Sequence, residues 1–217
     1  MTTQRVAVGF AVEGDLRFLA HQEMLRLFAR ACARAELPVR ASRGFNPKPR
    51  ISIPLPRPVG ITSADERLII ELDRPMDPGD VARRLAGQMP ADIVVHGAHV
   101  LPAGDRSLPD RVRYRVMMNG FDGERVRAHA ANALRAEPIW YDRFIHKLQK
   151  TRRIDLRPYI DAIDVTDDAV AFSLVVTGEG SARPAEICDI LGLGGQNVNH
   201  LIRRVETTWQ FHSTNHS

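Results

Sequence analysis

The sequence is poor in cysteine, lysine and aromatic residues, and it has no long hydrophobic run. Cys32 and Cys188 are the two cysteines among 217 residues, and neither has a further cysteine or histidine at a familiar zinc or iron–sulfur spacing. No segment approaches the roughly 18 apolar residues of a membrane helix, and the N-terminus lacks the pattern of a signal peptide. We therefore predict two buried thiols, no metal site, no cofactor, and a cytoplasmic protein without membrane contact.

The positive charge is concentrated in two segments. Residues 34–57 and 143–157 together carry a net charge of +10, so the rest of the chain carries −6 and the total is +4. Arginine provides 27 of the 30 basic residues, a bias that genome base composition alone can produce. Charged runs are also more often solvated faces than binding sites. Clustered charge is nevertheless the footprint of polyanion binding, so both interpretations stay open.

Hydrophobic periodicity predicts the element order β-α-β-β-α-β in the first half. Apolar residues alternate over 6–12, and helical spacing then runs from His21 until Pro38 stops it. The segments "RISIPLP" and "ERLIIELD" read as strands, a short helix follows "MDPGD", and "DIVVHGAHVL" reads as the last strand. We expect a first module over residues 1–103.

The second half repeats this order. Strands are predicted at "RVRYRVMM", "RIDLRPYIDAIDV", "AVAFSLVV" and "HLIRRVETTWQF", with helices in "GERVRAHAANALRA" and from Pro184. The repeat predicts an α+β fold of two tandem ferredoxin-like modules with antiparallel sheets. The second module covers residues 109–212, and residues 213–217 form a disordered tail.

The stretch "RASRGFNPKPRISIPLPRPVG" divides into two parts. Pro54, Pro56 and Pro58 have the same parity, which suits an edge strand that pairs on one side only. The preceding "SRGFNPKPR" predicts a stiff loop that displays cations beside Phe45, suited to phosphate contact and base stacking. The alternative is that Phe45 folds back onto the core and the cations face solvent.

The corresponding connection of the second module, "PIWYDRFIHKLQKTRRIDLRP", is also basic and aromatic. Matching connections in two modules suggest one shared RNA-binding surface. The candidate RNA-binding residues are Arg43, Phe45, Lys48, Arg50, Arg57, Lys147, Lys150, Arg152, Arg153 and Arg157.

Asp155 lies between Arg153 and Arg157 at a spacing of two residues along the predicted strand. It could orient both arginines toward phosphate or carboxylate, or it could belong to a structural ladder of ion pairs. We favour the structural ladder.

Four stretches resemble the radical-SAM-linked family: "GDLRFLAHQEMLRLFARA", "GFNPKPRISIPLPRPVG", "RRIDLRPYI" and "GSARPAEICDILG". The match covers nearly the whole chain in the same order. Members are small bacterial proteins of unassigned biochemical function, encoded beside a radical SAM protein with a B12-binding-type domain or fused to one. The resemblance implies such a protein as the partner and gives no catalytic residue.

Two distant cysteines cannot supply the CxxxCxxC triad that holds a radical SAM cluster, so the chain is not itself such an enzyme. Tandem ferredoxin-like modules also resemble the RAMP proteins that process CRISPR repeats, a likeness of fold alone. In RAMP endoribonucleases a general-acid/base histidine sits near the first helix, which makes His21 a weak catalytic candidate, assisted by Lys48 or Arg50. Packing or capping explains His21 more simply.

Three functions follow from the sequence. The leading hypothesis is a non-catalytic, RNA-binding accessory of a radical SAM enzyme. The second is a protein-docking module whose arginines bind an acidic surface of that partner without nucleic acid. The third is a small RAMP-like endoribonuclease that uses His21.

Overall fold

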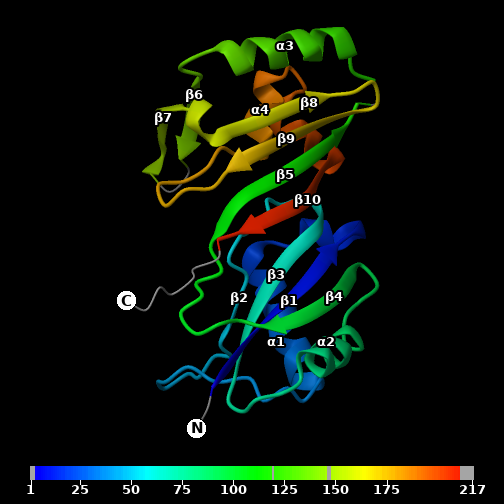
Figure 1. Ribbon diagram of the computed structural model, residues 1–217, viewed down its shortest axis with the longest axis vertical. Coiled ribbons are helices and arrows are strands. Elements are labelled where there is room, and N and C mark those ends of the chain that lie inside the picture. The colour runs from blue at the N-terminus through cyan, green and yellow to red at the C-terminus, as the bar shows by residue number, and fades with distance from the viewer. Residues whose placement is uncertain (1–2, 119, 146–147, 211–217) are drawn as a thin grey trace. The chain divides into compact units, whose positions relative to one another are not determined.

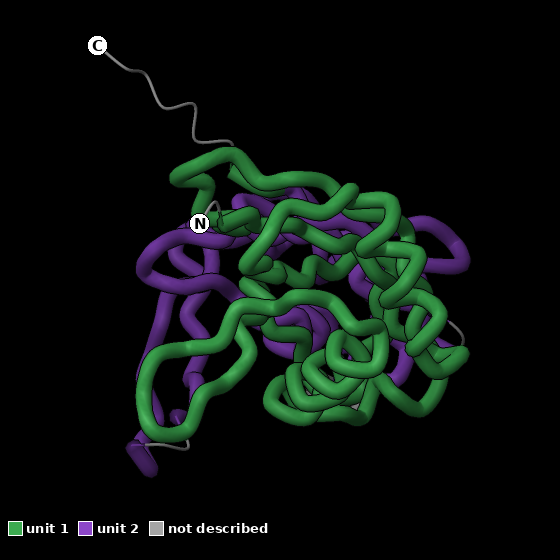
Figure 2. Tube along the Cα trace, turned by 90° about the horizontal axis from the view of Figure 1, so that it is seen from below, with its two compact units in different colours: residues 1–109, 209–217 green, residues 110–208 purple. Residues whose placement is uncertain are grey.

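The computed structural model describes residues 3–118, 120–145 and 148–210. Within these residues the fold is mixed α+β, with four α-helices, extended β-sheet and a separate two-stranded hairpin (Figure 1). The chain divides into two compact units, shown in different colours in Figure 2. Unit 1 contains residues 1–109 and 209–217, and unit 2 contains residues 110–208. No helix of the described residues is long and apolar enough to cross a membrane.

Unit 1 has the predicted order of strands and helices. Its elements are β1 (Gln4–Val12), the 3-10 helix η1 (Gly14–Phe18), α1 (His21–Arg34), β2 (Ile51–Ser52), β3 (Thr62–Leu72), α2 (Pro78–Ala86) and β4 (Ile93–Val100). Strand β1 lies between β4 and β3 and is antiparallel to both, and β2 is antiparallel to β3.

The core of unit 1 lies between the sheet and helices α1 and α2. The alternating apolar residues of β1 meet the apolar face of α1, where the Phe10 and Phe28 rings pack edge to face with centroids 4.7 Å apart. Both helices begin with side-chain caps that satisfy backbone donors. Glu23 accepts a hydrogen bond from the Ala20 amide at 2.8 Å, and Asp77 accepts one from the Asp80 amide at 3.0 Å.

Strand β2 is much shorter than predicted. The ladder with β3 contains only Ile51 and Ser52, and the segment that holds Pro54, Pro56 and Pro58 is irregular. The prediction that these prolines lie within a one-sided edge strand is therefore wrong. Proline has no N–H to donate to the ladder, so pairing stops shortly before the first of them.

Unit 2 contains more elements than predicted. They are β5 (Pro109–Met117), α3 (Gly123–Arg135), β6 (Trp140–Ile145), β7 (Lys150–Asp155), η3 (Arg157–Tyr159), β8 (Ile160–Val165), β9 (Ala169–Val175), α4 (Pro184–Ile190), η4 (Gly195–Leu201) and β10 (Ile202–Trp209). The strand order is β10-β5-β9-β8, and β5 and β8 are both antiparallel to β9. Tyr114 of β5 and Phe172 of β9 pack in the core with ring centroids 5.6 Å apart.

The predicted single strand "RIDLRPYIDAIDV" is wrong. Its first residues belong to β7, which pairs with β6 in a separate hairpin, and its last residues form β8. The break lies at Asp155, whose carboxylate accepts hydrogen bonds from the backbone amides of Ile139 at 2.8 Å and Arg157 at 3.0 Å. Pro158 then lies in the 3-10 turn η3, where no strand can continue.

Arginines on the face of β5 opposite the core are held by aspartates. In the register, Arg113 lies opposite Ser173 of β9, and Arg115 lies opposite Ala171. The pairs are Arg111–Asp161, Arg113–Asp164 and Arg115–Asp168, with N–O distances of 3.3, 3.3 and 3.2 Å. This face therefore carries balanced charge, although it is rich in arginine.

Candidate nucleic-acid interface

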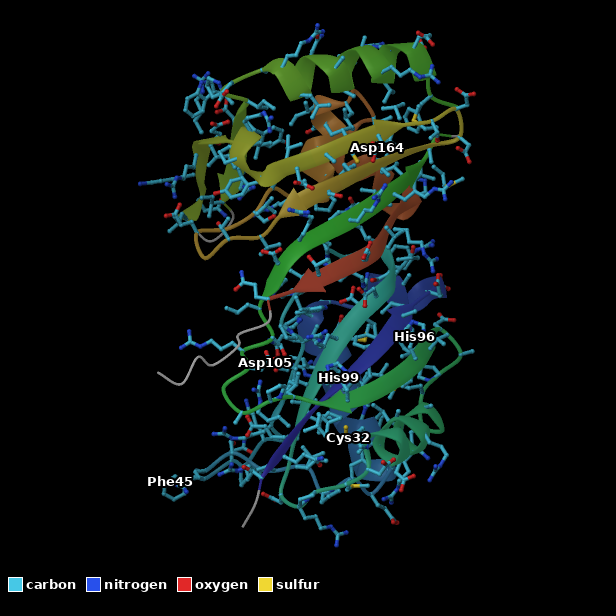
Figure 3. All side chains as sticks on the ribbon, in the orientation of Figure 1. Cys32, Phe45, His96, His99, Asp105 and Asp164 are labelled. Carbon is cyan, nitrogen blue, oxygen red and sulfur yellow. The ribbon has the colours of Figure 1, made fainter. Side chains whose placement is uncertain are left out.

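Residues 41–49, between α1 and β2, form a closed loop with an exposed aromatic tip. The Ser42 amide donates to the Lys48 carbonyl at 2.8 Å, and the Lys48 amide donates to Ser42 Oγ at 2.9 Å. Gly44 turns the chain with a φ of 131°. Phe45 is fully exposed and projects at the outer end of the loop (Figure 3). The alternative in which Phe45 packs onto the core is therefore wrong.

The cations of this first connection differ in what they contact. Arg43 and Lys48 are exposed, and within the part of the chain that the structure describes neither has an ion-pair partner. Arg50 lies 3.2 Å from the Glu71 carboxylate. Arg43 and Lys48 are therefore better placed than Arg50 for contact with an added polyanion.

Arg57 has a structural role that the sequence did not reveal. Its guanidinium donates to the carbonyl of Arg17 at 2.8 Å and to that of Pro58 at 3.2 Å, and it also contacts the Ile61 carbonyl. These bonds hold η1 against the proline-rich segment. Any contact between Arg57 and a phosphate would compete with them.

The β6–β7 hairpin forms most of the second connection and rests on α4 through one of its faces. Tyr141 donates its hydroxyl to Asp189 Oδ2 at 2.7 Å. Arg143 donates to Glu186 Oε1 at 2.5 Å and to Oε2 at 2.6 Å, and also to the Ser181 carbonyl at 3.0 Å. Burial and the hydrogen bond to Asp189 raise the pKa of Tyr141 to about 12.

The other face of the hairpin is exposed and carries Trp140 and Phe144. The Arg153 guanidinium lies over the Trp140 ring, 5.2 Å from its centroid. Lys150 and Arg152 of β7 lie opposite Ile145 and Arg143 and so point to the other side of the hairpin. Both are exposed, and no ion pair to either is found among the described side chains. This arrangement of cations and aromatic rings matches that of the first connection in composition.

Two further candidates in this connection gain less support. Arg157 donates to the Ile160 carbonyl at 3.0 Å and so helps to hold the turn before β8. Lys147 lies outside the described residues. Asp155 forms no ion pair with Arg153 or Arg157 within the described residues, and one of its carboxylate oxygens accepts hydrogen bonds from two backbone amides. The described contacts of Asp155 therefore support neither interpretation and give it a role in ending β7.

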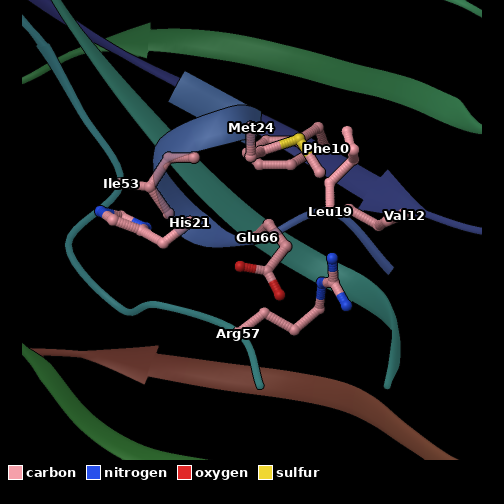
Figure 4. Close-up of a pocket in the computed structure, with 8 residues that line it drawn as sticks. All are labelled: Phe10, Val12, Leu19, His21, Met24, Ile53, Arg57 and Glu66. Carbon is pink, nitrogen blue, oxygen red and sulfur yellow. The ribbon is translucent and has the colours of Figure 1, made fainter. Parts of the chain in front are cut away.

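His21 is the first residue of α1 and lines a small cavity. The cavity is also lined by Arg57, Glu66 and apolar side chains that include Phe10, Met24 and Ile53 (Figure 4). Its volume of about 20 Å³ accommodates one water molecule and is far too small for a nucleotide. Neither Lys48 nor Arg50 is part of its lining. The surroundings of His21 therefore favour packing over the ribonuclease role.

Glu66 is a buried carboxylate that the sequence did not single out. It is 3% exposed, and Figure 4 shows its side chain next to that of Arg57. In the sequence Glu66 opens "ERLIIELD", where alternation with Leu68 and Ile70 places it on the inward face. This alternation was the signal that could have identified it, because an acid at an inward position requires a nearby donor.

Both cysteines are buried free thiols, as predicted. Burial raises the pKa of the Cys32 thiol to about 11 and, with the nearby Asp189, that of the Cys188 thiol to about 12. No group of three or more histidine, cysteine, aspartate or glutamate side chains that could hold a metal ion occurs among the described residues.

A family model described as "Uncharacterized protein conserved in bacteria (DUF2344)" matches residues 5–184. The chain belongs to this family. No curated protein matches this DUF2344 protein. A crystal structure of an unknown protein from Galdieria sulphuraria aligns over 97% of this chain and 100% of its own, with 11% sequence identity and a TM-score of 0.27. A TM-score this low does not establish a common fold.

Proposed function

We propose that this protein is a non-catalytic accessory of a radical SAM enzyme and that it binds RNA through its two basic connections. The observation that carries the proposal is the composition of the exposed side chains. Each connection carries exposed cations without a described ion-pair partner and also exposed aromatic rings: Arg43, Lys48 and Phe45 in unit 1, and Lys150, Arg152, Trp140 and Phe144 in unit 2.

The contrast with other arginines supports this choice of surface. Elsewhere on unit 2, the β5 arginines face aspartates at 3.2–3.3 Å, so their charge is already balanced. Surface cations that are not already paired with acids are the ones that release counterions when they meet phosphate. Exposed rings add base stacking, which does not depend on sequence.

The radical SAM partner is the part of the proposal that rests on the sequence resemblance. The chain has two buried cysteines on separate units, so any cluster chemistry would belong to the partner. The accessory would then present RNA to it.

The finer fold assignment is also a proposal: we infer that both units are ferredoxin-like modules. Unit 1 has the order β-α-β-β-α-β with strands arranged β4-β1-β3-β2, and unit 2 has the equivalent arrangement β10-β5-β9-β8. The β6–β7 hairpin is then an insertion between the first helix and the second sheet strand of the second module. A crystal structure with a different strand order in either unit would refute this assignment.

Filter binding of a mixed-sequence RNA at two salt concentrations tests the RNA function. We expect an affinity that falls steeply as the salt concentration rises, because lysine and arginine side chains would bind phosphates by displacing the salt cations that surround the RNA. Absent binding, or binding that is flat with salt, would refute it. The docking alternative predicts instead that the radical SAM protein remains bound after nuclease treatment and that RNA does not bind.

A further inference from the structure

The loop of residues 41–49 holds a single aromatic ring, Phe45, on a fixed stem. The Arg40 amide donates to the Glu71 carbonyl at 2.8 Å, and the Glu71 amide donates to the Arg50 carbonyl at 3.0 Å, so both sides of the stem are tied to β3. The Arg50 amide also donates to the Arg40 carbonyl at 2.8 Å. The loop contains two prolines, which restrict its backbone further. A stiff support of this kind lowers the entropy cost of binding a ligand.

The Phe45 ring is not used to pack unit 1. It is fully exposed and projects at the outer end of the loop (Figure 3). Among the described side chains, no ring–ring or cation–π contact includes it. Apolar surface stabilises a fold only when it is buried, so this ring contributes little to folding. Its flat faces are therefore available to a ligand.

The residues around Phe45 favour a nucleic-acid ligand over a protein. The loop contains Arg43 and Lys48 and no acid, and no acidic residue occurs anywhere in residues 37–64. Phe45 is also the only large apolar side chain of the loop. A ring that anchors a protein partner usually lies at the centre of an apolar patch from which charged residues are depleted. A lone ring between two cations instead suits a base and its phosphates.

The spacing along the loop suits one base and the phosphates next to it. Arg43 precedes Phe45 by two residues and Lys48 follows it by three, so their Cα atoms lie within about 7 Å and about 11 Å of the Phe45 Cα atom. A base stacked on the ring therefore brings phosphates close to both cations. Since the loop has one ring, it can stack one base.

We infer that this loop binds single-stranded RNA, with one unpaired base stacked on Phe45 and phosphates near Arg43 and Lys48. The inference rests on the proposed RNA function and specifies the form of RNA that the loop selects. Bases within a duplex are already stacked and paired, and the deep major groove of A-form RNA keeps side chains away from them. Unpaired bases leave their faces available for the ring.

Two substitutions of Phe45 test this directly. Each protein is titrated, at fixed salt, into a labelled single-stranded RNA of about 16 nucleotides and into the same strand annealed to its complement, with fluorescence anisotropy as the readout. Phe45→Leu keeps an apolar side chain and removes the ring, so it should weaken single-strand binding about tenfold and leave duplex binding unchanged. Phe45→Trp keeps a ring and should bind the single strand at least as tightly as the unmodified protein.

A salt series and a control variant separate stacking from other effects. Because Phe45 carries no charge, Phe45→Leu should leave the slope of log affinity against log salt unchanged. Phe18→Leu is the matched control, since Phe18 is an exposed ring of unit 1 outside the loop, and it should bind like the unmodified protein. Unchanged single-strand affinity of Phe45→Leu, or an equal loss for both RNA forms, would overturn the inference alone. Failure of the unmodified protein to bind either form would overturn the RNA function as well.

Discussion

The Arg143 guanidinium binds both carboxylate oxygens of Glu186, at 2.5 and 2.6 Å, and ties the β6–β7 hairpin to α4. The pair is largely buried, with side-chain exposures of 19% for Arg143 and 5% for Glu186. Within the basic segment, Arg143 thus belongs to the structure of unit 2. The cations beside it, Lys150 and Arg152, remain exposed.

Arg143→Met should destabilise unit 2, since it leaves the buried Glu186 carboxylate without its main partner. We expect a loss of about 3 kcal/mol in the free energy of unfolding, measured with urea. The double variant Arg143→Met with Glu186→Leu should recover much of that loss, because it removes the stranded charge as well. Equal stability of Arg143→Met and the unmodified protein would show that the pair contributes little.

The two thiols predict how stability responds to alkaline pH. Their ordinary pKa is 9.0, and burial raises the pKa values to about 11 for Cys32 and about 12 for Cys188. Above pH 9 the unfolded chain loses thiol protons that the folded chain keeps, so the thiol contribution to the free energy of unfolding should be constant below pH 9 and fall as the pH rises toward 11. Urea unfolding at a series of pH values measures this.

Replacement of both cysteines by alanine is the control for that measurement. The double variant should lose stability on account of the smaller side chains, and the slope of its stability between pH 9 and 11 should be shallower. An unchanged slope would assign the alkaline response to other groups, such as Tyr141.

Gly14→Ala should destabilise unit 1. Gly14 has a φ of +50°, and an added Cβ would overlap the Asp92 carboxylate. That carboxylate accepts hydrogen bonds from the Asp15 amide at 2.9 Å and the Leu16 amide at 3.3 Å. Its displacement would therefore shift both η1 and the start of β4, which follows Asp92 directly. We expect a loss of about 1–3 kcal/mol in the free energy of unfolding.

Gly97→Ala in β4 is the matched control, because a Cβ there meets no atom within 4 Å and its backbone is not in the left-handed region. It should change stability by less than about 0.5 kcal/mol. Similar thermal unfolding of the two variants would contradict the role assigned to Gly14.

Strands and helices with regular apolar spacing could be predicted from the sequence. The α1 stripe through Phe28 and Cys32 is buried as its spacing indicates, and Pro184 begins α4 as expected. The β6–β7 hairpin was missed because its inward residues include Arg143, which looks polar and pairs with an acid distant in sequence. The early end of β2 was missed as well. The equal spacing of Pro54, Pro56 and Pro58 predicts a strand with one edge able to pair, whereas the ladder ends at Ser52, before the first residue that lacks an N–H group.

The sequence could predict which types of residue the candidate site contains, but it could not predict which residues each of them contacts. The sequence pointed to cations near Phe45 and Trp140, and both rings are exposed. It could not separate Arg43 and Lys48 from Arg50, which contacts Glu71, or from Arg57, which binds backbone carbonyls. Those differences come from tertiary contacts between residues 21 to 43 positions apart, so they require the fold.

Charge reversal at the exposed cations of the two connections tests RNA binding most directly. The variants are Arg43→Glu with Lys48→Glu in unit 1 and Arg152→Glu in unit 2, and the control is Arg125→Glu, an exposed cation of α3 outside both segments. RNA affinity is measured for each by filter binding across a salt series. We expect both unit variants to bind more weakly, with the slope of log affinity against log salt reduced by about 0.7 for each phosphate that is no longer bound, and the control to match the unmodified protein. Equal affinities and slopes for all four proteins would contradict RNA binding through these connections.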